Sequence, residues 1–436
     1  MNLSAIRSRA SNRLLGASVL LSIYALSAST LVQADSQSGA WPTKSDVVGT
    51  QAGFSAEGLA ALDARMKQAV DEKQVAGVVT LLSHKGKVAA FNAHGAQSFE
   101  AGSAPMSENS IFRIYSMTKP ITGVAMMQLY EKGLWKLDDP VSKFVPELAN
   151  MKVVTGKDAQ GKPVIVNATR PATMREIMSH TAGLGYGLQP GNPVDDAFIA
   201  EKPMNQKDLQ GMIDVVSKIP LLAQPGTRWS YSIAVDIQGL IVERLSGEKF
   251  GTYLKNHIFE PLTMTDTAFT LDQSVKPRVA TVYSWDRATS KLVPSPDPWG
   301  PSVFPVQSGG GGLYSTIHDY ARFCQMLLSK GTLDGKQILK PETIALMTEN
   351  QIGDMKVFGA MPGTKFGLDF AVITDPAALK TAQGEGSYWW FGIAGTWFWI
   401  DPKNDLFFVG LIQRWLDPVS TSLRTDSAKL VYEALQ

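Results

Sequence analysis

The sequence of 436 residues predicts an α/β protein of the α+β type, with one antiparallel sheet built from both ends of the chain and flanked by helices. Strand patterns occur in pairs near the start, at 76–95, and again near the end, at 387–415. Helical patterns and polar loops dominate the chain between them. We therefore expect residues 35–115 and 305–436 to form an α/β domain, with a mostly helical lobe, 116–304, inserted into it.

The first 34 residues predict an export signal. Arg7, Arg9 and Arg13 precede the apolar run LLGASVLLSIYAL, and the small-residue site VQA ends at Ala34. Cleavage near Ala34 would give a periplasmic or secreted protein. The alternative is an N-terminal membrane anchor, because the apolar run is just long enough to span a bilayer, although Ser, Thr and Gly interrupt it. No later segment is long and apolar enough to do so, and we expect no stable membrane span after cleavage.

The elements of the sheet domain follow from local patterns. In the segment 55–74, Leu59, Leu62, Met66 and Val70 share one face of an amphipathic helix. The run AGVVTLLSHKGKVAAFNAHG then predicts an antiparallel hairpin around a Lys-Gly turn. Near the other end, YWWFGIAGTWFWIDP predicts a buried strand pair, and DLFFVGLIQRW predicts a further strand after the turn 401–405. The run SLRTDSAKLVYEAL predicts a final helix.

The composition excludes several classes of function. The chain has 41 basic and 40 acidic residues, and without a long basic run it shows no bias towards nucleic acid. Its single cysteine, Cys324, cannot form an intramolecular disulfide. The chain has no His-Glu-x-x-His sequence and no cysteine pair, so we expect neither a metal nor another cofactor. The oligomeric state does not follow from the sequence.

Two Ser-x-x-Lys sequences are candidates for a nucleophile and its base. Ser246 and Lys249 lie where a helix ends, and helix carbonyls there oppose a developing alkoxide. Ser116 and Lys119 lie at the start of the helix predicted for 118–132, where the partial positive charge of the helix terminus stabilises an alkoxide. Residues three apart share a helix face, and Lys119 can therefore reach Ser116. The alternative is a capping serine and a surface lysine.

Three further segments are candidates for partners of the nucleophile. Tyr231 enters a predicted helix after a Pro-Gly turn and could share a proton with Lys119, or it could be a packed core tyrosine. Trp390, Phe391 and Gly392 lie on a predicted strand, where a glycine allows a ligand to approach the backbone; the alternative is an aromatic-rich core strand. The glycine run 309–312 lacks the Gly-Lys-Ser/Thr ending of a phosphate loop, which favours a tight backbone crossing.

These motifs resemble those of the serine β-lactamase and penicillin-binding protein superfamily. The resemblance is to its class C β-lactamase-like branch, and within that branch most closely to the family VIII carboxylesterases. It covers nearly the whole mature chain, and the motifs occur in the family's order and spacing. The carriers are SMTK at 116–119, MSHTAGL at 178–184, YS at 231–232, GGGGLYST at 309–316 and WFGIAGTWFWIDP at 390–402.

The resemblance implies a β-lactamase/transpeptidase-like fold with the active site between the sheet domain and the helical lobe. It implies that Ser116 is the acylated nucleophile and that Lys119 and Tyr231 transfer the proton, without saying which of the two is the primary base. The Trp-Phe-Gly sequence at 390–392 would occupy the position of the Lys-Thr-Gly strand motif. The backbone N–H groups of Ser116 and Ile393 would then form the oxyanion hole.

Two departures from the β-lactamase pattern bear on the substrate. The Tyr-x-Asn motif becomes Tyr-Ser-Ile with Ile233 at its end, and Trp390 replaces the lysine of the strand motif. Both changes remove groups that would bind polar parts of a β-lactam or peptide. The sequence therefore predicts a carboxylesterase acting on a small-molecule ester or amide, with weak β-lactam hydrolysis as a side activity. The alternatives are a β-lactamase or D-amino-acid peptidase, and a non-catalytic cell-wall-binding protein.

Overall fold

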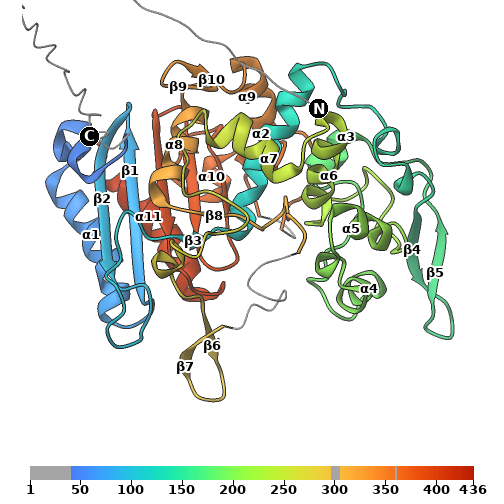
Figure 1. Cartoon of the computed structure of the whole chain (residues 1–436), viewed down its shortest axis with the longest axis horizontal. Coiled ribbons are helices and arrows are strands. Elements are labelled where there is room, and N and C mark those ends of the chain that lie inside the picture. Colours follow the sequence, from blue (N-terminus) through green and yellow to red (C-terminus); the bar gives the residue numbers. More distant parts are fainter. Residues whose placement is uncertain (1–40, 296–304, 359–360) are drawn as a thin grey trace, which may run out of the picture. The chain divides into compact units, whose positions relative to one another are not determined.

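The computed structural model describes residues 41–295, 305–358 and 361–436, which belong to one compact unit. The predicted signal at 1–34 lies outside these residues. A seven-stranded antiparallel sheet forms the centre of the α/β part (Figure 1). In sheet order its strands are β11 (Thr364–Phe366), β12 (Ala371–Ile373), β13 (Tyr388–Phe391), β14 (Trp397–Asp401), β15 (Leu406–Leu411), β1 (Gly77–His84) and β2 (Lys87–Gly95).

The two ends of the chain meet inside this sheet. Strand β1 pairs antiparallel with β15, with Val79 opposite Leu411, and every residue of both strands is buried. The turn between β1 and β2 consists of Lys85 and Gly86, both in the left-handed region with φ of +51° and +72°. That conformation suits a two-residue hairpin turn. The predicted sheet and its N-terminal hairpin are confirmed.

Helices cover both faces of the sheet. Helices α1 (Ala56–Asp71) and α11 (Pro418–Ala434) pack together on one face, and α8 (Ile317–Leu328) lies on the other (Figure 1). Strand β14 contacts helices on both faces of the sheet. Trp399 stacks on Tyr432 of α11, with ring centroids 5.8 Å apart, and Phe398 packs against Tyr320 of α8, with centroids 5.2 Å apart. A strand buried on both faces shows no alternation of polar and apolar residues, which explains the apolar run from Trp397 to Ile400.

The middle of the chain is helical, as predicted, but it also contains hairpins that the sequence did not indicate. Its helices are α2 (Thr118–Glu131), α3 (Met174–Met178), α4 (Pro193–Glu201), α5 (Leu209–Val216), α6 (Ala234–Ser246) and α7 (Phe250–Leu254). The hairpins are β4 (Lys152–Lys157) with β5 (Pro163–Asn167), and β6 (Tyr283–Asp286) with β7 (Lys291–Pro294). The division into two domains remains a prediction.

Four short strands and two short helices lie outside the seven-stranded sheet and the elements named above. Strands β3 (Phe112–Arg113) and β8 (Tyr314–Ser315) pair with each other, which joins the segment before Ser116 to the segment after the glycine run. The additional helices are α9 (Pro341–Thr348) and α10 (Pro376–Leu379), and the strands β9 (Thr332–Leu333) and β10 (Lys336–Gln337) form a small separate hairpin.

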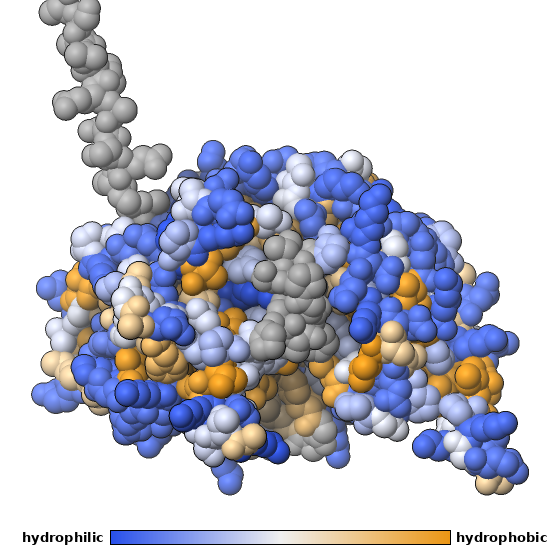
Figure 2. All heavy atoms as spheres, turned by 60° about the horizontal axis from the view of Figure 1, so that its bottom comes forward, coloured by the Kyte–Doolittle hydropathy of each residue, from blue (hydrophilic) through white to orange (hydrophobic). Residues whose placement is uncertain are grey.

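Among the described residues, no helix has both the length and the apolar character needed to span a bilayer. On the face drawn in Figure 2, hydrophobic residues form separate groups among hydrophilic ones.

Candidate active site

Ser116 lies in a tight turn immediately before α2. Tyr115, Ser116 and Met117 form a single turn of 3-10 helix, and α2 starts at Thr118. Tyr115 adopts a φ of +42°, which is rare for a residue with a side chain and costs about 1–3 kcal/mol. The surrounding structure holds this conformation, since the Tyr115 ring packs at 5.7 Å from that of Trp415. The strained residue therefore directly precedes the predicted nucleophile.

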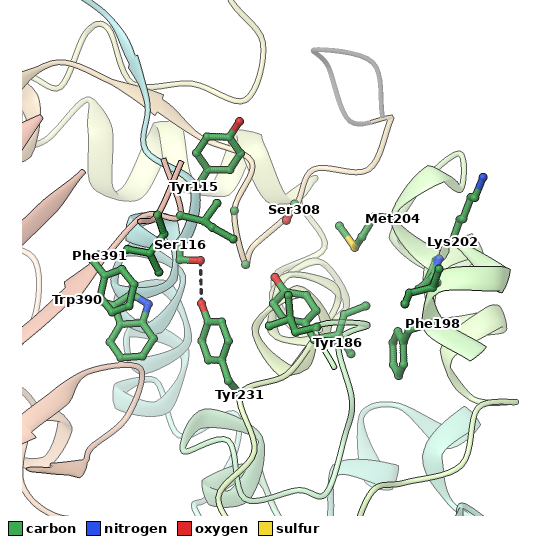
Figure 3. Close-up of a pocket in the computed structure, with 18 of the residues that line it drawn as sticks. Tyr115, Ser116, Tyr186, Phe198, Lys202, Met204, Tyr231, Ser308, Trp390 and Phe391 are labelled. Carbon is green, nitrogen blue, oxygen red and sulfur yellow. Dashed lines mark hydrogen bonds between the residues drawn. The ribbon is translucent and has the colours of Figure 1, made fainter. Parts of the chain in front are cut away.

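The structure brings Ser116, Lys119 and Tyr231 together. The Tyr231 hydroxyl donates a hydrogen bond of 2.8 Å to Ser116 Oγ (Figure 3). Lys119 Nζ lies 3.4 Å from the same oxygen. Lys119 lies in the first turn of α2 and is fully buried, and Tyr231 comes from the segment that leads into α6. One hydroxyl thus contacts both a phenol and an amine, the arrangement that nucleophilic catalysis needs.

The Lys119 ammonium group lies among carbonyl, hydroxyl and aromatic groups. Nζ donates to the Gly310 carbonyl at 2.6 Å and to the Tyr186 hydroxyl at 3.4 Å. It also lies 4.5 Å from the centroid of the Tyr231 ring and 5.1 Å from that of Tyr186. These contacts hold the amine next to Ser116 while the helix buries the rest of the side chain.

A buried carboxyl group is hydrogen-bonded to the residues that surround Lys119. Asp236, in the first turn of α6, accepts hydrogen bonds from Ser308 Oγ at 2.5 Å, the Gly310 N–H at 3.0 Å and the Tyr186 hydroxyl at 3.4 Å. Burial raises the pKa of Asp236, although Lys119 and these donors oppose the shift. Burial and the nearby Asp236 also raise the pKa of the Tyr186 phenol, which favours its neutral form.

Sequence reasoning missed Tyr186, Asp236 and Ser308. The one available signal was Asp236 itself, an acid within the apolar run SIAVDIQGLIV. Such a residue needs a partner inside the protein, because an unpaired buried carboxylate is costly. Nothing in the sequence identified which residues supply that partner.

The glycine run makes the tight backbone crossing that the sequence predicted. A Cβ atom on Gly310 would lie 2.5 Å from Asp236 Oδ2 and 2.7 Å from the Tyr186 hydroxyl. A Cβ on Gly309 would lie 2.5 Å from the Val235 carbonyl oxygen. These positions must be glycine for the Gly310 carbonyl to reach Lys119.

The predicted strand motif lies next to Ser116. Trp390 and Phe391 end β13, and a Cβ on Gly392 would lie 2.5 Å from the carbonyl oxygen of Ile114. Glycine therefore lets the strand end touch the turn that carries Ser116. Neither the Ile393 N–H nor the Ser116 N–H donates a hydrogen bond to another described residue. Both amides are thus available for a substrate oxygen, as an oxyanion hole requires.

A cavity of about 590 Å³ opens over Ser116 and has mostly apolar walls. In Figure 3, Trp390 and Phe391 lie on one side of Ser116, whereas Tyr186, Phe198 and Met204 lie on the other. Ile233 also lines the cavity, and Trp390 packs on Tyr231 at 5.4 Å. The two positions at which the sequence departs from the β-lactamase pattern therefore both present apolar groups here. Lys202 is the one residue with a charged side chain among the described residues that line the cavity.

His180 lies behind Tyr231 rather than in the cavity. Its ring is fully buried, 4.8 Å from the Tyr231 ring, and its Nδ1 is 3.0 Å from Ser232 Oγ. Burial, together with the nearby Lys119, lowers the pKa of His180 well below its ordinary value. The imidazole is therefore neutral and packs as part of the wall that positions Tyr231.

The second Ser-x-x-Lys pair is not assembled as a catalytic site. Ser246 is the last residue of α6, and its hydroxyl donates to the Val242 carbonyl at 2.7 Å. Lys249 is directed to Glu243, at 3.4 Å. The C-cap glycine Gly247, with φ of +75°, confirms the predicted helix end. Within the described part of the chain, no group of three or more His, Cys, Asp or Glu side chains could hold a metal ion.

Comparison with known proteins places these features in a family. The family described as Beta-lactamase matches residues 62–433. Protein Rv1367c of Mycobacterium tuberculosis is 34% identical, over 85% of this chain and 98% of the relative. Esterase EstB of Burkholderia gladioli is 30% identical, over 79% of this chain and 88% of the relative. Among solved structures, "EstCE1, a hydrolase with promiscuous acyltransferase activity" superposes with a TM-score of 0.73 at 28% identity, covering 86% of this chain and 99% of that one. The chain belongs to the beta-lactamase family.

Proposed function

We propose that this serine hydrolase cleaves uncharged carboxylic esters through an acyl-enzyme on Ser116. The observation that carries the proposal is the joint contact of Ser116 Oγ with the Tyr231 hydroxyl at 2.8 Å and Lys119 Nζ at 3.4 Å, at the base of a mostly apolar cavity. The names of the relatives support it, since EstB is an esterase and EstCE1 a hydrolase.

The reaction follows from these contacts. Ser116 Oγ attacks the ester carbonyl carbon and passes its proton to the pair formed by Lys119 and Tyr231. The N–H groups of Ser116 and Ile393 stabilise the oxyanion. Collapse of the tetrahedral species breaks the ester bond, and the pair returns the proton to the departing alkoxide. Water then repeats the sequence on the acyl-enzyme, which releases a carboxylic acid and regenerates Ser116.

A fluorophosphonate tests the nucleophile. We expect it to phosphonylate the folded protein once, with the mass shift located on the peptide that contains Ser116, and Ser116→Ala to lose both the label and about 10³-fold or more of the esterase activity. The control is Ser246→Ala, which removes the other Ser-x-x-Lys serine and should leave labelling unchanged. A folded protein that is labelled elsewhere or not at all contradicts the proposal.

The substrate preference is a separate prediction. The apolar cavity lacks an amide at Ile233 and a cation at Trp390, so p-nitrophenyl esters of short acids should have a higher kcat/KM than nitrocefin. A higher kcat/KM for nitrocefin would indicate that the enzyme is a β-lactamase. If Ser116→Ala retained both the esterase and the β-lactamase activity, the cluster around Ser116 would have a non-catalytic role.

We further propose that the protein is exported to the periplasm or secreted. The support is the sequence at 1–34, in which three arginines precede an apolar run and a small-residue cleavage site.

A further inference from the structure

A second cavity, of about 560 Å³, lies between the sheet and α11. It is nearly as large as the cavity over Ser116, and its walls come from β13, β14, α11 and the segment after α10. We call it the α11 cavity and define it by five of its lining residues, Trp389, Trp399, Arg424, Ala428 and Tyr432. Ser116, Lys119 and Tyr231 do not line it.

Arg424 is a partly buried cation with no anionic partner among the described residues. Its guanidinium group lies over the rings of Phe391, at 4.1 Å from the centroid, and Trp389, at 5.4 Å. The side chain makes no hydrogen bond or ion pair with another described residue. Burial lowers its pKa to about 10, which still leaves it protonated at neutral pH.

Other arginines of this chain meet carboxylates. Arg244 pairs with Glu147 at 2.7 Å, and Arg278 pairs with Asp266 at 2.6 Å. Arg65 pairs at 2.8 Å with Asp426, which lies only two residues beyond Arg424 on α11. A guanidinium group removed from water without such a partner is costly, and its five N–H donors are arranged to hold a carboxylate through two hydrogen bonds.

No carboxylate among the described residues that line the α11 cavity pairs with Arg424. Lys380 and Lys429 also line the cavity, and Glu433, the one acidic side chain among its described lining residues, lies 3.7 Å from Lys429. The charge on the walls is therefore predominantly positive. That charge favours an anionic ligand.

The remaining walls include the aromatic side chains of Trp389, Phe398, Trp399 and Tyr432, which suit a flat apolar group. The rings of Trp399 and Tyr432 stack with their centroids 5.8 Å apart and their planes at 28°. Trp399 is only 3% exposed, and its indole N–H has no partner among the described residues. Trp389 contributes a further aromatic surface beside Arg424.

We propose that the α11 cavity is a binding site for a small aromatic carboxylate, separate from the site at Ser116. Its carboxylate accepts two hydrogen bonds from the Arg424 guanidinium group, and its ring packs against the aromatic walls formed by Trp389 and Trp399. The two sites share β13, because Arg424 lies on Phe391 and Phe391 also lines the cavity over Ser116. The binding itself does not depend on the chemistry proposed for Ser116.

Calorimetric titration of the intact protein tests the site, with 2-naphthoate as the probe and 2-naphthamide as its neutral counterpart. We expect naphthoate to bind at least ten-fold more tightly than the amide, and Arg424→Gln to weaken naphthoate binding at least ten-fold while the weak binding of the amide changes little. Arg65→Gln is the matched control, because it removes a neighbouring arginine that is already paired and does not line the cavity. Its Kd for naphthoate should equal that of the unaltered protein.

A second variant keeps the test decisive if Arg424→Gln does not fold. Ala428→Trp retains Arg424 and fills the α11 cavity, so it should also abolish naphthoate binding. Equal affinities for naphthoate and the amide would overturn the proposal. So would naphthoate binding that survives Arg424→Gln or Ala428→Trp in a folded protein, because the probe would then occupy another cavity.

Discussion

Tyr186 joins the Lys119 amino group and the Asp236 carboxyl group of the active-site cluster, and its hydroxyl group provides a test of their coupling. The hydroxyl accepts from Lys119 and donates to Asp236, each at 3.4 Å. Tyr186→Phe removes both contacts while retaining the ring beside Lys119. We expect kcat for ester hydrolysis to fall about 10-fold, which corresponds to about 1.4 kcal/mol, the net value of one ordinary hydrogen bond.

A matched control exists in Tyr253, whose hydroxyl is buried without a partner among the described residues and lies outside the cavity over Ser116. Tyr253→Phe should leave kcat unchanged. An unchanged kcat in Tyr186→Phe as well would show that its hydroxyl does not help to hold Lys119 in its working position.

At the scale of residues, local spacing predicted Ser116 and Lys119 as a pair, because positions three apart on one helix must lie close together. Tyr231 followed from its place at a helix entry and from the order of the motifs. Tyr186 and Asp236 could not be predicted, because they belong to segments whose distance from Ser116 is set by the packing of α6 against the glycine run. The spacing of residues within one segment does not indicate which distant segments pack against it.

At the scale of elements, the contact between α6 and the 3-10 turn Pro146–Leu148 makes stability depend on pH. Arg244 of α6 donates to both carboxylate oxygens of Glu147, at 2.7 and 3.0 Å. These hydrogen bonds are the main reason that the pKa of Glu147 is lowered from 4.5 to about 2. A lowered carboxyl pKa stabilises the fold at pH values above 4.5, and that contribution is lost as the pH falls from 4.5 towards 2.

Glu147→Gln should therefore lower the free energy of unfolding by about 1 kcal/mol at pH 7, the size expected for a partly exposed ion pair. The difference from the unaltered protein should shrink at pH 3, as measured by urea unfolding at both pH values. Glu201→Gln, at an exposed position without an ion pair among the described residues, controls for the loss of charge alone. A difference that is equal at both pH values would mean that the ion pair does not set the pKa.

Whether a strand could be predicted depended on its length and on its pattern of apolar residues. The aromatic strands β13 and β14 and the hairpin β1–β2 have long apolar runs and clear turns, so they were predicted. Strand β5 is exposed along its whole length and therefore shows no alternation. Strands β11 and β12 have three residues each, which is too short for any period to appear.

At the scale of the whole molecule, the order of segments along the chain predicted a sheet built from both ends, and the structure confirms it. The order of strands within that sheet was not predictable, because side chains buried on both faces do not identify their neighbours. Helix α1 packs on α11, and the Gln436 N–H donates to the Gly53 carbonyl at 3.0 Å, so the last residue of the chain lies beside the start of α1.

Export is the remaining prediction at this scale. When the full chain is expressed in a bacterial host with a periplasm, we expect the protein outside the cytoplasm. Its mass should be that of a chain that begins at Asp35. Ala34→Leu replaces the small residue at the predicted cleavage site and should leave a precursor that retains residues 1–34. Unaltered protein that keeps this segment in the membrane fraction would favour the N-terminal anchor instead.

The pairing of β1 with β15 also has a consequence for synthesis. The ribosome completes the first hairpin long before it reaches β15, so during most of translation β1 has one long apolar edge without its partner. Such an edge pairs readily with strands of other chains. Products truncated before β15 should therefore aggregate, whereas the finished chain hides the same edge inside its sheet.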